Sequence, residues 1–176
     1  DKIERYAYHP EYIPFTQFSG LPLDFPLLGS GQGNQPFKTE KDYSDWLKRT
    51  ENFPAWMDAA IENFREGITN QYVLPKKLVV KMVTQMNAEE ITTSDFSKNI
   101  FYGPINNFPK NFTAAQREKF TNEFKTMITK IIIPSYTKMG SFLQTEYLPK
   151  ARTTDGINGL PKGNDIYAYF AKSWTT

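Results

Sequence analysis

The chain has 176 residues, of which 39% are hydrophobic and 15% aromatic, so it has the length of one ordinary domain and enough apolar surface for a core. Its 21 basic and 19 acidic side chains give a formal net charge of +2, and the nearest basic cluster, Lys76 and Lys77, is only two residues long. Nucleic-acid binding and polybasic membrane binding are therefore not expected, because both need clustered Lys and Arg.

Residues 1–38 are predicted to form an extended apolar arm. The segment GSGQGN at 29–34 and five prolines interrupt it, a density of breakers that predicts neither a regular helix nor a long strand. Its many aromatic and aliphatic residues are not typical of a disordered linker, so we expect the arm to pack along a helical body. The prolines are Pro10, Pro14, Pro22, Pro26 and Pro36.

Residues 39–176 are predicted to form a helical domain, which makes the fold all-α. Thr39 is a suitable N-cap with Asp42 three residues on, and Asn52 is predicted to cap the next helix. Pro75 is predicted to open a third helix. After each of these three helix starts, apolar residues recur at helical spacing, and we interpret them as core. They are Tyr43, Trp46, Leu47, Met57, Ala60, Ile61, Phe64, Leu78, Val79, Met82, Val83 and Met86.

A kinked pair of long helices is predicted from Thr113 to Pro149. Residues 92–112 before it indicate a short helix and then a loop. Thr113 and Gln116 match a capping box, and a helical apolar period continues on both sides of Pro134. A proline inside a helical pattern kinks or ends the helix, and we interpret Pro134 as the kink.

The stretch RTTDGINGLPKGNDIYAY, residues 152–169, is the best candidate for a binding site. Arg152 is a fixed cation that suits a carboxylate, and Asn164 is predicted to cap a last helix. Free amides at such a helix start favour an anion, such as the C-terminal carboxylate of a peptide, with the Tyr167 hydroxyl near. The alternative is a packed turn between helices, in which Arg152 pairs with a structural acid.

Residues for catalysis or metal binding are scarce in this chain. It has no cysteine, which excludes thiolate catalysis, disulfides and Cys-based zinc, and its one histidine, His9, cannot build a His-rich metal site. His9 precedes Pro10, and we interpret it as structural or exposed. No HExxH, GxSxG, P-loop or CxxC pattern is present, and no apolar stretch reaches the about 18 residues that span a bilayer.

Two long segments of the chain, together covering about residues 40–176, resemble the DUF885 family of bacterial proteins. A D-Y-xx-W-L-x-R helix, an I-xxx-R-x-G-I segment and a long final motif are matched in order. The matching residues are Asp42, Tyr43, Trp46, Leu47, Arg49, Ile61, Arg65, Gly67, Ile68, Pro134, Tyr136, Phe142, Leu143, Glu146, Tyr147, Leu148, Pro149, Arg152, Gly156, Leu160, Pro161, Gly163 and Tyr167.

The resemblance implies that this chain is the N-terminal helical part of a larger protein. Family members look like exported bacterial lipoproteins and HExxH zinc metallopeptidases, with the zinc helix downstream of the segment seen here. The resemblance thus implies zinc for the full-length family and no zinc ligand in this chain. It also implies one wall of a peptide-binding cleft, with Arg152, Gly163, Asn164 and Tyr167 as substrate-binding residues.

Three readings of the function remain open. In the first, the chain is the helical part of a metallopeptidase-like protein and is inactive by itself. Its partner is then the remainder of its own polypeptide. The second is a non-catalytic binding or scaffold module of an exported lipoprotein, with the aromatic arm as contact surface. The third is a carrier of lipid or a small ligand. The first predicts exposed apolar faces and self-association of the chain by itself. Localisation is expected to be periplasmic or membrane-anchored, although the absence of cysteine also fits the cytoplasm.

Overall fold

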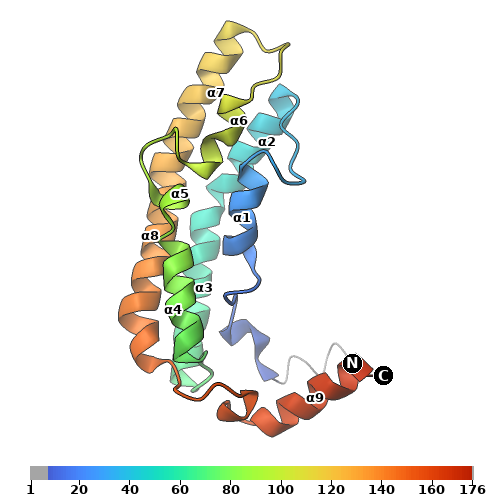
Figure 1. Cartoon of the computed structure of the whole chain (residues 1–176), viewed down its shortest axis with the longest axis vertical. Helices are drawn as coiled ribbons and strands as arrows, with labels where there is room; N and C mark the ends of the chain where they lie inside the picture. The colour runs from blue at the N-terminus through green and yellow to red at the C-terminus, as the bar shows by residue number, and fades with distance from the viewer. Residues whose placement is uncertain (1–7, 176) are drawn as a thin grey trace.

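The computed structural model describes residues 8–175, except for the side chain of Trp174. Figure 1 shows an elongated bundle of helices with α9 (Gly163–Thr175) set across its lower end and pointing away from it. In place of a sheet, residues 8–175 contain one isolated parallel bridge, between Pro75 and Arg152. The predicted all-α fold is confirmed.

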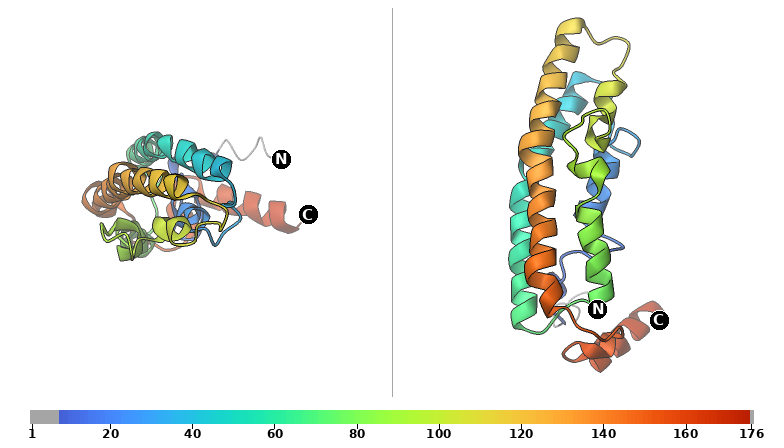
Figure 2. Two further views of the ribbon diagram at one scale, coloured as in Figure 1. Left: turned by 90° about the horizontal axis from the view of Figure 1, so that it is seen from above. Right: turned by 60° about the vertical axis from the view of Figure 1, so that its left-hand side comes forward.

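Long helices run along the bundle and build its body, as the two views of Figure 2 show. Shorter helical turns connect them. The body helices are α1 (Leu21–Gly29), α2 (Glu40–Glu51), α3 (Phe53–Thr69), α4 (Lys76–Met86), α7 (Ala114–Met127) and α8 (Ile133–Phe142). The short turns are η2 (Pro10–Tyr12), α5 (Glu89–Thr92), η3 (Ile100–Tyr102), α6 (Gly103–Asn106), η6 (Leu148–Lys150) and η7 (Ile157–Gly159).

Two of the four predicted helix caps are confirmed. Thr39 and Thr113 both form capping boxes, with Asp42 and Gln116 as their partners. Asn52 makes no side-chain cap, because its own backbone is right-handed helical (φ −88°, ψ −6°) and the chain passes from α2 into α3 almost without a break. A side-chain cap needs the extended backbone that Thr39 has.

The predicted kinked pair of long helices is confirmed, and its two halves, α7 and α8, form one bent helix. Between α7 and α8 lies a π-helical turn, η4 (Ile128–Ile132), and a second one, η5 (Leu143–Tyr147), follows α8. Each π turn ends two residues before a proline, Pro134 or Pro149. The wider π turn makes room between the proline ring and the carbonyl four residues earlier, so the helix continues through Pro134.

The N-terminal arm is not extended throughout, and this part of the prediction is wrong. α1 is a helix with Pro22 in its first turn and Pro26 inside it. Pro22 is tolerated there because first-turn amides have no partner within a helix. Pro26 has no amide to donate to the carbonyl of Pro22, and the buried Tyr136 hydroxyl of α8 donates to that carbonyl instead, at 2.7 Å. A tertiary contact thus replaces the helical hydrogen bond.

Two further boundaries differ from the sequence predictions. The region 92–112 was predicted as a short helix and then a loop, but its helical turns η3 and α6 lie later, across Pro104. The last helix begins at Gly163, so Asn164 lies inside its first turn and is not the cap. In both cases a Pro or Gly sits in a first turn, where a missing amide or side chain costs little.

The core is aromatic. Tyr43 of α2 lies among the rings of Phe112, Phe120 and Phe124, at centroid distances of 5.2, 5.0 and 5.6 Å. Its hydroxyl donates to the carbonyl of Pro104 at 2.9 Å, and burial raises its pKa to about 12. The predicted methionine and aromatic stripes are confirmed as core by the burial of Trp46, Met57, Phe64, Met82 and Met86. The apolar period on both sides of Pro134 is buried as well, at Phe120, Phe124 and Met139.

Candidate functional site

The loop from Ala151 to Lys162 joins the bundle to α9 and contains the predicted binding stretch. It is attached to the connection between α3 and α4 by a short parallel ladder. The amide of Arg152 donates to the carbonyl of Leu74 at 3.2 Å, and the amide of Lys76 donates to the carbonyl of Arg152 at 2.8 Å. The loop start is therefore fixed against the lower end of the bundle.

The Arg152 side chain holds this loop in shape. Its Nε donates to the carbonyl of Val73 at 3.0 Å, and its Nη1 donates to the carbonyls of Thr154 at 2.5 Å and Gly156 at 2.6 Å. Burial of the guanidinium lowers the pKa of Arg152. The group thus binds backbone carbonyls on both sides of the junction. This is the packed-turn alternative, except that carbonyls take the place of a structural acid.

Three more contacts fasten the same junction. The Tyr72 hydroxyl donates to the carbonyl of Pro161 at 3.0 Å, and Lys77 pairs with Asp155 at 2.8 Å. The buried Tyr147 hydroxyl accepts from the amide of Leu74 at 2.9 Å, and burial raises the Tyr147 pKa to about 12. The loop therefore starts α9 from a defined position.

The four predicted substrate-binding residues fall into two groups. Arg152 and Gly163 belong to the packed loop: a Cβ on Gly163 would lie 2.3 Å from the carbonyl oxygen of Ile157. Asn164 and Tyr167 lie on the outside of α9, where Tyr167 is 63% exposed. Asn164 and Tyr167 are thus accessible to a ligand, whereas the Arg152 side chain is hydrogen-bonded to backbone carbonyls.

A small cavity of about 220 Å³ lies beside the loop, and we call it the junction pocket. The His9 and Tyr12 rings are stacked at 4.7 Å and 10°, and Tyr72 meets both rings edge-on, at 6.3 and 5.8 Å. Three segments supply its lining residues, which are His9, Tyr12, Asn70, Tyr72, Pro161 and Lys162. The sequence does not predict this pocket, because its three segments are separated by about 60 and about 90 residues and no motif marks them.

The close approach of the arm to the bundle requires a glycine at Gly67. A Cβ there would lie 2.8 Å from the carbonyl oxygens of both Tyr12 and Tyr72. Any side chain at this position would push the arm away from the α3–α4 connection. Gly67 thus allows the two aromatic walls of the junction pocket to meet.

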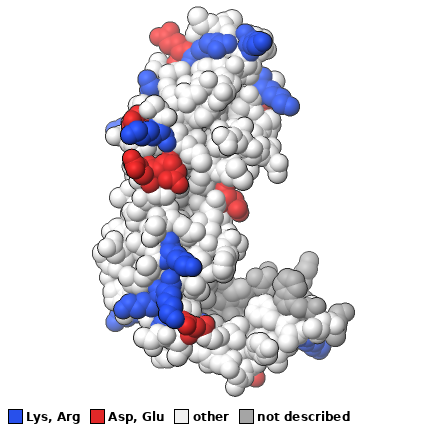
Figure 3. Space-filling model, viewed as in Figure 1, with Lys and Arg blue, Asp and Glu red and all other residues white. Residues whose placement is uncertain are grey.

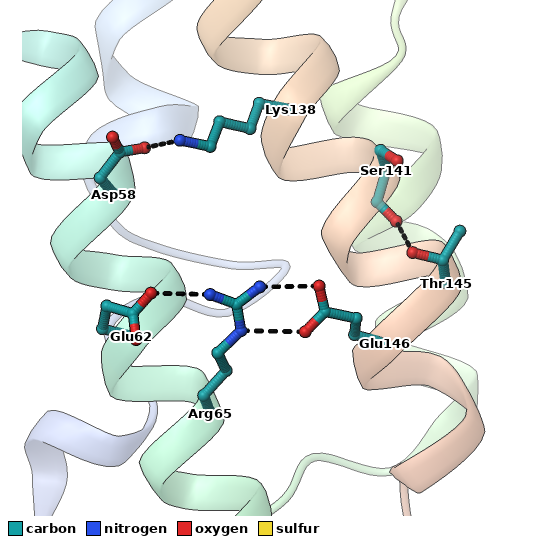
Figure 4. Close-up of polar contacts among 7 residues, drawn as sticks. All are labelled: Asp58, Glu62, Arg65, Lys138, Ser141, Thr145 and Glu146. Atoms are coloured by element: carbon teal, nitrogen blue, oxygen red, sulfur yellow. Dashed lines mark hydrogen bonds and ion pairs between the residues drawn. The ribbon is translucent and has the colours of Figure 1, made fainter.

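A charged network joins α3 to α8 and η5 (Figure 4). Arg65 holds Glu146 in a two-pronged ion pair at 2.9 and 2.7 Å, and it also pairs with Glu62 at 2.7 Å. Lys138 pairs with Asp58 at 2.6 Å. The Arg65 hydrogen bonds lower the pKa of Glu146. Three carboxylates face two cations here, so the network links helices and keeps only a small net negative charge.

The described part of the chain has few side chains that could bind a metal ion and few clusters of like charge. No group of three or more His, Cys, Asp or Glu side chains there could hold a metal ion. On the face drawn in Figure 3, basic and acidic side chains lie in small scattered groups. None of the described helices is long and apolar enough to cross a membrane.

Comparison with protein families then decides the assignment. The family described as "Bacterial protein of unknown function (DUF885)" matches residues 2–176. The chain belongs to the DUF885 family. The resemblance predicted from the sequence is confirmed, and no curated protein matches the chain.

One solved structure resembles this DUF885 chain over most of its length. It is described as "The crystal structure of the putative lipoprotein from Colwellia psychrerythraea", with a TM-score of 0.76 and 20% sequence identity. The match covers 86% of the present chain and 26% of that chain. The bacterial protein shares the fold, and the present chain spans about a quarter of its length.

The residues that carry the DUF885 resemblance have structural contacts here. Arg65 and Glu146 come from different motifs and bind each other, as Figure 4 shows. Tyr147 and Arg152, both from the final motif, bind the backbone between α3 and α4. The motifs therefore describe how separate helices and the α9 loop are joined.

Proposed function

We propose that this chain is the helical part of a larger, metallopeptidase-like DUF885 protein and forms one wall of a peptide-binding cleft. The observation that carries this proposal is the coverage of the solved relative, in which the shared fold accounts for only 26% of the chain. Most of such a protein would lie outside the fold described here, and the chain by itself would be inactive.

Exposed apolar side chains support a covering partner from the same polypeptide. Phe18 is 86% exposed and Leu27 of α1 is 56% exposed, and on α9 Tyr167 is 63% and Phe170 37% exposed. In Figure 1, α9 projects from the bundle toward the side on which α1 and the preceding arm lie. These four side chains are therefore the candidates for contact with a covering part of the same polypeptide.

The site residues take different roles in this proposal. Asn164 and Tyr167 would touch the peptide, since they are the accessible pair. Arg152 and Gly163 would hold the loop that presents them. The described residues do not fit a zinc ion, so no catalytic step is assigned to them, and zinc would have to be bound by another part of the protein. Export to the periplasm or membrane anchoring belongs to the same proposal, which the description of the similar structure as a "putative lipoprotein" supports.

The first test is the coding sequence beyond Thr176. We expect it to continue into a helix with an HExxH motif, and a stop codon directly after Thr176 would contradict the proposal. In the complete gene product, Asn164→Ala and Tyr167→Phe are each expected to raise KM by a few-fold to about tenfold, since each removes a substrate contact. Asn122→Ala, at an exposed position on α7, is the matched control.

A second candidate function is a non-catalytic scaffold module. The high exposure of Phe18 and Leu27, both from the arm region, favours it, since the same side chains would then contact a separate protein. The two proposals differ in one measurement. Peptidase activity of the complete gene product supports the first, and a correctly folded complete product with no activity on any peptide in a library supports the scaffold.

A further inference from the structure

The backbone around the junction pocket is unusual. Among the described residues, three that are not glycine have positive φ: His9 at 49°, Gln71 at 62° and Lys162 at 55°. Each comes from a different segment. His9 and Lys162 line the pocket directly, and Gln71 lies between the lining residues Asn70 and Tyr72.

A left-handed backbone is costly for residues of this kind. Glycine adopts it freely, and asparagine, aspartate and histidine adopt it more often than other residues, so the cost of about 1–2 kcal/mol falls chiefly on Gln71 and Lys162. His9 and Lys162 both line the cavity that their left-handed backbones border. Strain of this kind gathers at ligand clamps, where the side chain itself is needed.

The chemistry of the lining selects one class of ligand. Tyr12 and Tyr72 offer aromatic surface, and Lys162 supplies a cation. No acidic residue is among the six described lining residues, so that charge is not neutralised within the lining. The carboxylate of Glu11 contacts His9 Nδ1 at 2.9 Å, which orients the imidazole. Aromatic rings alone would also suit an organic cation, but Lys162 would repel one.

We propose that the junction pocket binds a small organic carboxylate with a flat apolar body. The carboxylate pairs with the Lys162 ammonium, and the apolar body lies against the rings of Tyr12, Tyr72 and His9. The volume of about 220 Å³ is below the about 300–1,000 Å³ of sites for drug-sized ligands, so the bound part has the size of one aromatic ring with its acid group. This proposal does not depend on the proposed peptidase-related function.

Titration of the isotope-labelled chain, followed by NMR, tests the proposal. The probes are phenylacetate as a free acid and N-acetylphenylalanine as a mimic of a peptide C-terminus. Saturable shifts at residues 9–12, 70–72 and 161–163 are expected, with roughly millimolar affinity for ligands of this size. The two probes share the proposed chemistry, and their relative affinity tells whether a free acid or a peptide end is preferred.

Variants separate the charge from the fold. Lys162→Gln is expected to weaken binding about tenfold or more, since it removes the charged partner, while Lys81→Gln at an exposed site on α4 leaves it unchanged. Lys162→Gly is expected to abolish binding and yet raise the thermal midpoint by about 2–4 °C, because glycine relieves the backbone strain. If Lys162 had only a structural role, Lys162→Gly would not abolish ligand binding while raising the thermal midpoint.

Several outcomes would overturn the proposal. These are no saturable shift with either acid, equal binding by Lys162→Gln, and equal binding of N-acetylphenylalaninamide, which lacks the carboxylate. Tighter binding of choline than of either acid would overturn it as well, because the pocket would then be an aromatic site for cations.

Discussion

Arg152 and Arg65 both belong to the motifs of the family, and each connects separate elements. Arg152 donates to carbonyls of the α3–α4 connection and of its own loop. Arg65 bridges α3 and the π turn η5 through Glu146. In each case the planar guanidinium supplies several donors in fixed directions, which a lysine could not do.

Removal of the Arg152 side chain is expected to loosen the loop. Arg152→Ala leaves the carbonyls of Val73, Thr154 and Gly156 without this donor, and we expect a loss of about 1–3 kcal/mol in the free energy of unfolding. Urea denaturation measures the loss, and amide hydrogen exchange at residues 151–162 should accelerate. Lys150→Ala, at an exposed neighbour, is the control; equal stability of the two variants would contradict the clamp.

The Arg65–Glu146 pair predicts a pH-dependent stability. Its hydrogen bonds lower the pKa of Glu146 in the folded state below the ordinary 4.5, so the pair stabilises the fold at pH values above 4.5. That contribution is lost as the pH falls through the lowered pKa. Glu146→Gln should therefore be less stable than the wild type at pH 7, and the difference should shrink on acidification toward pH 3.

Chemical denaturation at a series of pH values measures this effect. Glu66→Gln, an exposed residue on α3, is the control and should show no such convergence. A difference between Glu146→Gln and the wild type that is constant from pH 7 to pH 3 would show that the charge of Glu146 has no part in its effect.

At the scale of elements, a hydroxyl of α8 stabilises α1 by taking the place of the amide that Pro26 lacks. Tyr136→Phe would leave the buried carbonyl of Pro22 without its donor, and a destabilisation of about 1–3 kcal/mol is expected. Pro26→Ala restores an amide four residues after Pro22. In the Tyr136→Phe background this second change should recover part of the loss.

A double-mutant cycle by urea denaturation measures that coupling. The coupling free energy is expected to be favourable, because the alanine amide has a free acceptor only when the hydroxyl is gone. Phe120→Leu is the control, because Phe120 is also fully buried but its ring packs against Tyr43 and Phe112, so its effect should add to that of Pro26→Ala. Strict additivity of Tyr136→Phe and Pro26→Ala would contradict the exchange of donors.

Local sequence was a good guide to elements whose signals lie within one turn. The capping boxes at Thr39 and Thr113 follow from residues three apart, and the core stripes follow from helical spacing. α1 was missed because its stabilising donor comes from a residue 114 positions away. The π turns before Pro134 and Pro149 are likewise not encoded in a simple apolar period.

At the scale of the whole molecule, the exposed apolar side chains predict self-association of the chain by itself. Phe18→Ser, Leu27→Ser and Phe170→Ser together should reduce it, because they remove apolar surface that water solvates poorly. Sedimentation velocity over a concentration series measures the effect. Lys81→Ser on α4, at an exposed residue that is already polar, is the control. A monodisperse monomer at high concentration in the wild type would contradict an uncovered interface.

The sequence by itself determined the helical class, the main caps, the core stripes and the family, because these depend on residue spacing along one chain. Only the tertiary structure decided what the stretch from Arg152 to Tyr169 does. In the fold, the Arg152 guanidinium donates to backbone carbonyls, and Asn164 and Tyr167 lie exposed on α9. The fold also places His9, Tyr72 and Lys162 around one pocket. Contacts between residues 60 to 150 positions apart depend on how the helices are packed, and no local pattern records them.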